Sequence, residues 1–160
     1  MNGCRHAIKG EMDMVSIDLL KRVSIFSGLS DDQLLRIAHL CREVTHSKGD
    51  VIVREKEPST DLYIIREGTV EVALGTPSAP GPTPIVHLGK GQIFGEVALV
   101  DRGLRSATVN ALADGTVLYA IGRDDFIRLC DEDAHIGYIV MGNIAADLSF
   151  KLRHYNLAWR

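Results

Sequence analysis

Residues 94–109 of the chain have the sequence FGEVALVDRGLRSATV. Gly95 precedes a short apolar segment, and the loop that follows ends at Arg105 and Ser106. A glycine permits backbone conformations and close approaches that a Cβ prevents, and the segment after it can form about one helical turn, whose first N–H groups lack acceptors. Such a turn attracts an anion, and the guanidinium fork of an arginine suits phosphate oxygens. The stretch therefore predicts a site for a small phosphorylated ligand.

An acidic residue, Glu96, stands at the start of the same turn. A carboxylate repels phosphate, but it can accept a hydrogen bond from a sugar hydroxyl, as acidic residues do in dinucleotide sites. A sugar and a phosphate together indicate a nucleotide. The alternative is an ion pair between Glu96 and Arg105 that braces a hairpin and binds no ligand.

The stretch resembles the phosphate-binding cassette of the cyclic nucleotide-binding domains, which carries Phe-Gly-Glu-x-Ala-Leu, a short loop, and then Arg-(Ala/Ser/Thr)-Ala-Thr-Val. Leu104 stands where that family often has proline, which loosens the loop without removing a ligand contact. The resemblance implies that Glu96 holds the ribose 2′-hydroxyl and that Arg105 pairs with the cyclic phosphate. The full set of ligand-binding residues that it implies is Phe94, Gly95, Glu96, Val97, Ala98, Arg105, Ser106 and Ala107.

The spacing of apolar residues changes twice along the sequence around this cassette. Apolar residues recur at helical spacing over residues 15–26, and a second helix is expected after Ser30, because Gln33 completes a capping box with it. Short β-branched and aromatic runs broken by glycine turns follow as far as residue 122. Helical spacing then returns, with the longest helix over residues 134–155. The order predicts an α+β fold, mainly an antiparallel β-roll of the jelly-roll or cupin-like barrel kind, with N-terminal helices and a long C-terminal helix.

We expect a mobile leader over residues 1–13 and a single domain over residues 14–160. Within that domain, helices are predicted over about 15–45, the β-roll over about 46–122 and further helices over about 123–156. Four of the five prolines lie in residues 75–84, and proline cannot continue a sheet ladder, so this segment is predicted to be a solvated hairpin loop.

The long C-terminal helix has two predicted roles. In the resembled family this helix folds over the base as a lid, which on this chain makes Tyr138, Phe150 and Arg153 candidates for base contact. For the two aromatic residues, ordinary core or dimer packing is an equally good interpretation. Residues 143–153 also resemble the dimer helix of the catabolite activator relatives, which predicts a homodimer through the C-terminal helix.

Composition excludes several other classes of protein. A net charge of −3 and a pI near 6.0 provide no general field to attract nucleic acid or an anionic membrane. No apolar run approaches the ~20 residues that cross a bilayer, and charged residues interrupt the N-terminus where a signal peptide needs an apolar core. The 3 cysteines lack metal-ligand spacing, so we expect reduced thiols, a cytoplasmic location and no metal or other cofactor.

These observations predict a stand-alone regulatory module that binds a cyclic mononucleotide, with cyclic AMP preferred to cyclic GMP. The module is expected to signal to an effector protein in trans by movement of the cassette and the C-terminal helix. Two alternatives stay open: the sensor part of a transcription regulator that lacks its DNA-binding domain, and an assembly module that binds no ligand. An enzyme on a cupin-like barrel is not expected, because the 6 histidines are scattered singly and form no metal constellation.

Overall fold

The computed structural model describes residues 17–158 of the chain, and their side chains as far as residue 154. The predicted leader over residues 1–13 lies outside the described residues. Two compact units are distinguished: a helical unit within Met1–His39 and Leu129–Arg160, and a strand unit formed by Leu40–Arg128. The prediction of one domain over residues 14–160 stays a prediction.

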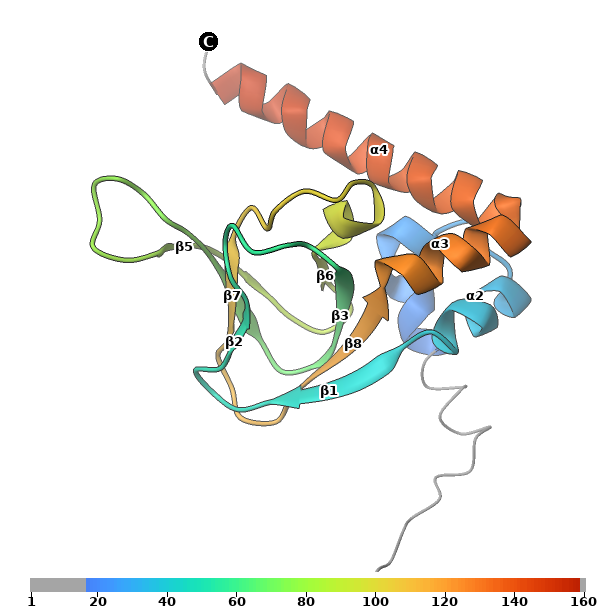
Figure 1. The fold of residues 1–160 in the computed structure, drawn as a ribbon, viewed down its shortest axis with the longest axis horizontal. Helices are drawn as coiled ribbons and strands as arrows, with labels where there is room; N and C mark the ends of the chain where they lie inside the picture. The colour runs from blue at the N-terminus through green and yellow to red at the C-terminus, as the bar shows by residue number, and fades with distance from the viewer. Residues whose placement is uncertain (1–16, 159–160) are drawn as a thin grey trace, which may run out of the picture. The chain divides into compact units, whose positions relative to one another are not determined.

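The strand unit contains two four-stranded sheets in which every pairing is antiparallel (Figure 1). The first sheet has the order β1-β8-β3-β6 and the second the order β2-β7-β4-β5. The strands are β1 Arg42–His46, β2 Val51–Val53, β3 Asp61–Glu67, β4 Val70–Leu74, β5 Thr83–Leu88, β6 Ile93–Phe94, β7 Thr108–Ala111 and β8 Thr116–Gly122. This architecture confirms the predicted antiparallel roll with helices on either side of it in the sequence.

Side chains from both sheets form one apolar core in this unit. Its buried members are Val53, Ile65, Val70, Phe94, Val109 and Leu118. They come from β2, β3, β4, β6, β7 and β8, so the core joins strands that are far apart in the sequence. Phe94 is the last residue of β6, and its burial fixes the point at which the chain leaves the roll toward Gly95.

The first strand lies inside the range predicted to be helical. Helices were expected over residues 15–45, but β1 spans Arg42–His46 and pairs along its whole length with β8, from Arg42 opposite Ala120 to His46 opposite Thr116. Along β1 only Val44 and His46 are half-buried. Such a short alternation does not distinguish a strand from the end of a helix, so the pairing with β8 decides the conformation.

The proline-rich segment forms the connection between β4 and β5, as predicted (Figure 1, green). Strand β5 begins earlier than expected, at Thr83, and therefore includes Pro84. A proline is tolerated there because β5 is the last strand of its sheet and its outer edge has no neighbouring strand to receive an N–H.

The helical unit contains helical residues 17–22, the 3₁₀ turn η1 Ser24–Phe26, the helix α2 Asp31–Ala38 and the helix α4 Ala134–Ala158, while α3 Arg123–Glu132 runs from one unit into the other. The predicted capping box is present, with Ser30 and Gln33 bonded reciprocally at 3.1 and 3.2 Å. The Asn143 side chain of α4 donates to the carbonyl oxygens of Ile25 and Ser27, both at 2.9 Å. These bonds hold α4 against η1.

The apolar residues of α4 divide between two environments. Ile136, Val140 and Ile144 are buried, whereas Leu152 is 64% exposed. The buried apolar residues therefore lie in the first half of the helix, although Tyr138 in that half is 78% exposed. Within residues 17–158, no helix has both the length and the apolar character that a membrane span requires.

A series of glycine substitutions tests the turns of the strand unit. Gly68 has φ +89°, and a Cβ there would lie 2.5 Å from the Thr116 hydroxyl oxygen and 2.9 Å from the Thr116 Cα. We expect Gly68→Ala to lower the free energy of unfolding by about 2 kcal/mol or more, because left-handed strain and a backbone clash add. Chemical denaturation provides the measurement.

Two further glycines separate these contributions. Gly115 has φ +68° but nothing within 4 Å of its Cβ position, so Gly115→Ala should cost about 1 kcal/mol from strain alone. Gly81 is open and has no positive φ, and Gly81→Ala should change stability by less than about 0.5 kcal/mol. Equal losses for Gly68→Ala and Gly115→Ala would contradict the clash with Thr116.

Candidate functional site

The predicted cassette lies between β6 and β7. After Phe94 the chain turns at Gly95, whose φ of 78° and ψ of 17° are left-handed, and forms the single 3₁₀ turn η2, Glu96–Leu99. The expected helical turn is thus present in its tighter form. Residues 100–107 then form the loop that brings Arg105 back before β7 begins at Thr108.

The two ends of the cassette meet at Gly95. A Cβ placed on this residue would lie 2.8 Å from the carbonyl oxygen of Asp61 and would overlap Nη1 of Arg105. Only a glycine allows the Arg105 guanidinium to lie against the backbone at this point. The structure therefore brings Gly95 and Arg105 together, although the sequence separates them.

The Arg105 guanidinium is buried, with 8% of the residue exposed. Its Nη2 donates to the carbonyl oxygen of Asp61 at 2.9 Å, and its guanidinium carbon lies 5.7 Å from the centre of the Tyr63 ring. Nη1 is also buried and has no hydrogen-bond partner among residues 17–158. A buried donor without an acceptor is costly to a protein, and an anion in this place would remove that cost.

The aromatic residues beside Arg105 form a stack. The rings of Tyr63 and Phe94 lie 4.9 Å apart and are tilted by 15°, so Phe94 packs in the core and supports the ring that faces the guanidinium. Burial, followed by the nearby Asp61 carboxylate, raises the pKa of the Tyr63 phenol. Burial lowers the pKa of Arg105, and the neighbouring Tyr63 and Asp61 oppose that shift.

A backbone ladder holds the cassette loop. The Arg105 N–H donates to the carbonyl oxygen of Glu57 at 2.7 Å, and the Arg105 carbonyl accepts from the Lys56 N–H at 2.8 Å. One step further along, the Ser59 N–H donates to the carbonyl oxygen of Gly103 at 3.1 Å. The segment before β3 thus fixes the backbone on which Arg105 stands.

The other predicted cassette residues surround this point with different exposure. Val97 is 40% exposed and Ser106 is exposed, whereas Glu96 and Ala107 are half-buried. Ala98 is buried, and its N–H donates to the carbonyl oxygen of Gly95 at 3.0 Å. This amide therefore closes the turn η2, and the predicted role of Ala98 in ligand binding stays a prediction.

The three predicted lid residues lie on α4. Tyr138 is 78% exposed, Phe150 is 55% exposed and Arg153 is also exposed. The Phe150 ring contacts the ring of His154, with the centres 3.9 Å apart. These residues belong to the helical unit and the cassette to the strand unit, so contact with a base stays a prediction.

Two residues that hold Arg105 were not predicted from the sequence. Asp61 and Tyr63 lie at the start of β3, and the hydrogen bond from Arg105 to Asp61 joins positions 44 residues apart. The only sequence signal was a tyrosine within an otherwise aliphatic run. The described residues contain no group of three or more histidine, cysteine, aspartate or glutamate side chains that could hold a metal ion.

Comparison with known proteins identifies a family and several relatives. The family model described as the cyclic nucleotide-binding domain matches residues 43–133. A cAMP-dependent protein kinase regulatory subunit of Debaryomyces hansenii is 37% identical over 112 residues, which are 70% of this chain and 24% of that protein. A cGMP-dependent protein kinase of Drosophila melanogaster, isozyme 2, is 36% identical over 113 residues, which are 70% of this chain and 12% of that protein. The chain thus spans a quarter or less of the length of these two relatives.

A solved structure resembles the chain over a larger share of its length. The Thermus thermophilus catabolite activator protein matches with a TM-score of 0.74 and 28% identity, covering 85% of this chain and 61% of that one. The matched fold and the matched family agree with the roll and the cassette described above.

Proposed function

Because the chain belongs to the cyclic nucleotide-binding domain family, we propose that it binds a cyclic mononucleotide at the cassette and acts as a regulatory module. The observation that carries this proposal is the buried Nη1 of Arg105, a guanidinium donor that has no acceptor and lies against Gly95. The cyclic phosphate provides the acceptor. Glu96, at the start of η2, accepts the ribose 2′-hydroxyl.

The proposed chemistry is binding without catalysis. The phosphate replaces a missing hydrogen bond, and no bond of the ligand is broken, so neither a metal nor a further cofactor is required. The proposed location is the cytoplasm. We place cyclic AMP ahead of cyclic GMP, and the exposed Ser106 hydroxyl leaves cyclic GMP as the competing ligand. One relative is named for each nucleotide.

The proposed switch is a shift between two conformations. A ligand changes an equilibrium only through its preference for one state. The elements proposed to differ between the two states are the cassette, in which Arg105 exchanges the Asp61 carbonyl for phosphate, and the helix α4. Tyr138, Phe150 and Arg153 are the proposed lid residues. The effector is a protein in trans, and the alternative role, the sensor part of a transcription regulator, is favoured by the likeness to a catabolite activator protein.

We also propose a homodimer through the second half of α4. Phe150 and Leu152 are large apolar side chains that are 55% and 64% exposed. Packing of the same patch from a second copy removes this apolar surface from water.

Arg105→Met tests the proposed ligand. Calorimetric titration of the parent chain with cyclic AMP, cyclic GMP and linear AMP should show binding of at least one cyclic nucleotide and weaker binding of linear AMP. Arg105→Met should weaken cyclic nucleotide binding at least about tenfold, because it removes a charge-assisted hydrogen bond. The free energy of unfolding should change by no more than about 1 kcal/mol, since one donor is already unpaired.

The matched control is Arg54→Met, the same change at an arginine whose side chain is 64% exposed. It should leave binding unchanged. Absence of heat with every cyclic nucleotide, or unchanged affinity in Arg105→Met, would falsify the proposal and favour the assembly module.

Glu96→Ala tests the proposed sugar contact through a double-mutant cycle. Cyclic AMP should bind about tenfold more weakly to the variant, because the carboxylate acceptor for the 2′-hydroxyl is lost. With 2′-deoxy cyclic AMP, which has no such hydroxyl, parent and variant should bind alike. If the variant weakens both ligands equally, Glu96 acts on the cassette conformation and not on the ribose.

Leu152→Glu tests the proposed dimer. A carboxylate placed in an apolar contact would have to be buried, so the variant should sediment as a monomer at concentrations where the parent is a dimer. Ser149→Glu, at an exposed polar position of the same helix, is the control and should leave the dimer intact. A Leu152→Glu variant that still dimerises places the interface elsewhere.

A further inference from the structure

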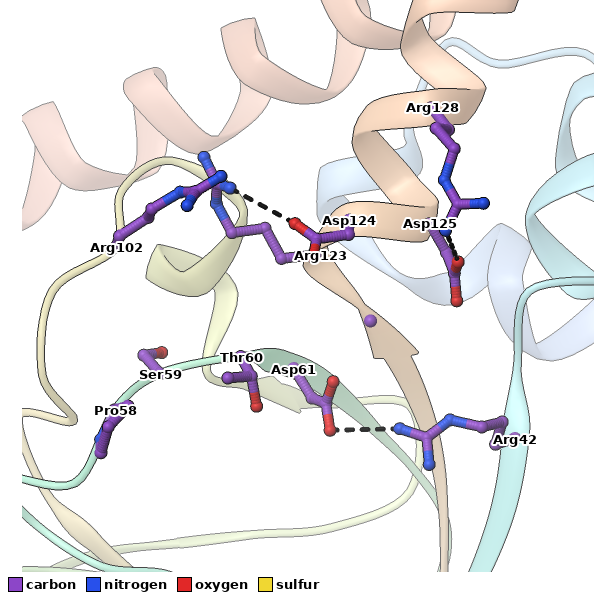
Figure 2. Close-up of a pocket in the computed structure, with 11 residues that line it drawn as sticks. Arg42, Pro58, Ser59, Thr60, Asp61, Arg102, Arg123, Asp124, Asp125 and Arg128 are labelled. Atoms are coloured by element: carbon purple, nitrogen blue, oxygen red, sulfur yellow. Dashed lines mark hydrogen bonds and ion pairs between the residues drawn. The ribbon is translucent and has the colours of Figure 1, made fainter.

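A pocket lies in the strand unit, apart from the predicted ligand residues. Its volume is about 520 Å³ (Figure 2). Its walls come from Arg42 of β1, from the residues before and at the start of β3, from the end of β8 with the first turns of α3, and from Arg102 of the cassette loop. Gly95, Glu96 and Arg105 do not line it. The volume falls in the range of sites for small organic ligands.

Four arginines and three aspartates line this pocket. Their formal charges sum to +1, because four positive charges face three negative ones. Two of the arginines are already engaged in hydrogen bonds: Arg42 donates to Asp61 at 3.1 Å and Arg128 donates to Asp125 at 2.7 Å. Figure 2 shows both of these pairs as dashed lines.

The other two arginines, Arg102 and Arg123, have spare donors. Arg102 has no hydrogen-bond or ion-pair partner among the described residues. Arg123 approaches Asp124 only at 3.7 Å, and just 19% of its side chain is exposed. Its Nε is buried and has no hydrogen-bond partner in the described part of the chain. Two guanidinium groups of like charge in one pocket repel each other, and an anion that bridges them relieves the repulsion.

The remaining polar groups of the pocket indicate what else the ligand carries. Asp61 and Asp124 provide carboxylate acceptors, and Ser59 and Thr60 provide hydroxyl groups. Acceptors beside arginine donors suit a molecule that bears hydroxyl groups next to its anionic group. An inorganic anion alone would leave most of a pocket of this volume unfilled.

We propose that this pocket binds a hydroxylated phosphate monoester, such as a pentose phosphate, with the phosphate between Arg102 and Arg123 and the sugar hydroxyls on the aspartates. The site is distinct from the proposed cyclic nucleotide site, whose residues Gly95, Glu96 and Arg105 do not line it, and its ligand can bind without the cyclic nucleotide. It nevertheless includes the cassette loop, because Arg102 precedes Gly103, whose carbonyl accepts from Ser59, another lining residue.

The test is calorimetric titration of the full chain with ribose 5-phosphate, in the absence of any cyclic nucleotide. The parent should bind this probe and should not bind ribose, which lacks the phosphate. Arg102→Gln and Arg123→Gln should each weaken binding at least about tenfold, which corresponds to about 1.4 kcal/mol for the lost charge-assisted bonds. Arg54→Gln, an exposed arginine outside the pocket, is the charge-matched control and should bind as the parent does.

Arg105→Met distinguishes the two sites. It should retain ribose 5-phosphate binding, since Arg105 does not line the pocket. Loss of binding in this variant would assign the phosphate to the cassette and overturn the proposal, as would unchanged affinity in Arg102→Gln or no binding by the parent. In the labelled protein, the Nε–Hε resonance of Arg123 should shift on addition of the probe, and a fixed resonance would equally contradict the site.

Discussion

The buried guanidinium of Arg105 is the constraint on which the arrangement of the cassette depends. A charge in the interior needs partners close by, and each neighbour of Arg105 meets part of that need. Gly95 lacks the Cβ that would occupy the place of Nη1, the Asp61 carbonyl accepts from Nη2, and the Tyr63 ring faces the guanidinium carbon. The bond from the Arg105 N–H to Glu57 fixes the backbone below. One donor is still unpaired, so the folded chain retains an unsatisfied positive group at the place where an anion is proposed to bind.

The sequence allowed the cassette to be predicted because its chemistry is local. The turn at Gly95, the helical turn after it and the arginine that closes the loop all lie within residues 94–109, and the structure has each of them. The residues that hold the arginine were beyond prediction from spacing, because Asp61 and Tyr63 reach it only through the pairing of β3 with β6, which sets Tyr63 opposite Phe94. In addition, every residue has a backbone carbonyl, so the presence of an aspartate at position 61 could not indicate that its carbonyl accepts from Arg105.

Tertiary contacts also explain the conformation of β1 and the uneven burial of α4. Strand β1 has little alternation of its own, and its conformation comes from the continuous pairing with β8. In α4 the helical period was visible, but the period alone could not show that Ile144 is buried, Leu148 half-buried and Leu152 exposed. The capping box at Ser30 and Gln33 was predicted because both partners lie within one turn. Hydrogen bonds between residues within one turn could thus be predicted from the sequence, and the pairing of strands far apart in the sequence could not.

Asp61 contacts both the cassette and the pocket lined by Arg102 and Arg123, through different atoms. Its carbonyl oxygen accepts from Arg105, its carboxylate accepts from Arg42, and its backbone stands opposite Gly122, which lines the pocket. In the proposed switch, in which Arg105 exchanges this carbonyl for phosphate, the carbonyl loses its side-chain donor. A half-buried carbonyl that loses its donor needs another donor or water, so the proposed switch would also act on the Asp61 carboxylate, which accepts from Arg42. Because linkage is reciprocal, the two proposed ligands would be coupled to each other wherever both of them act on Asp61.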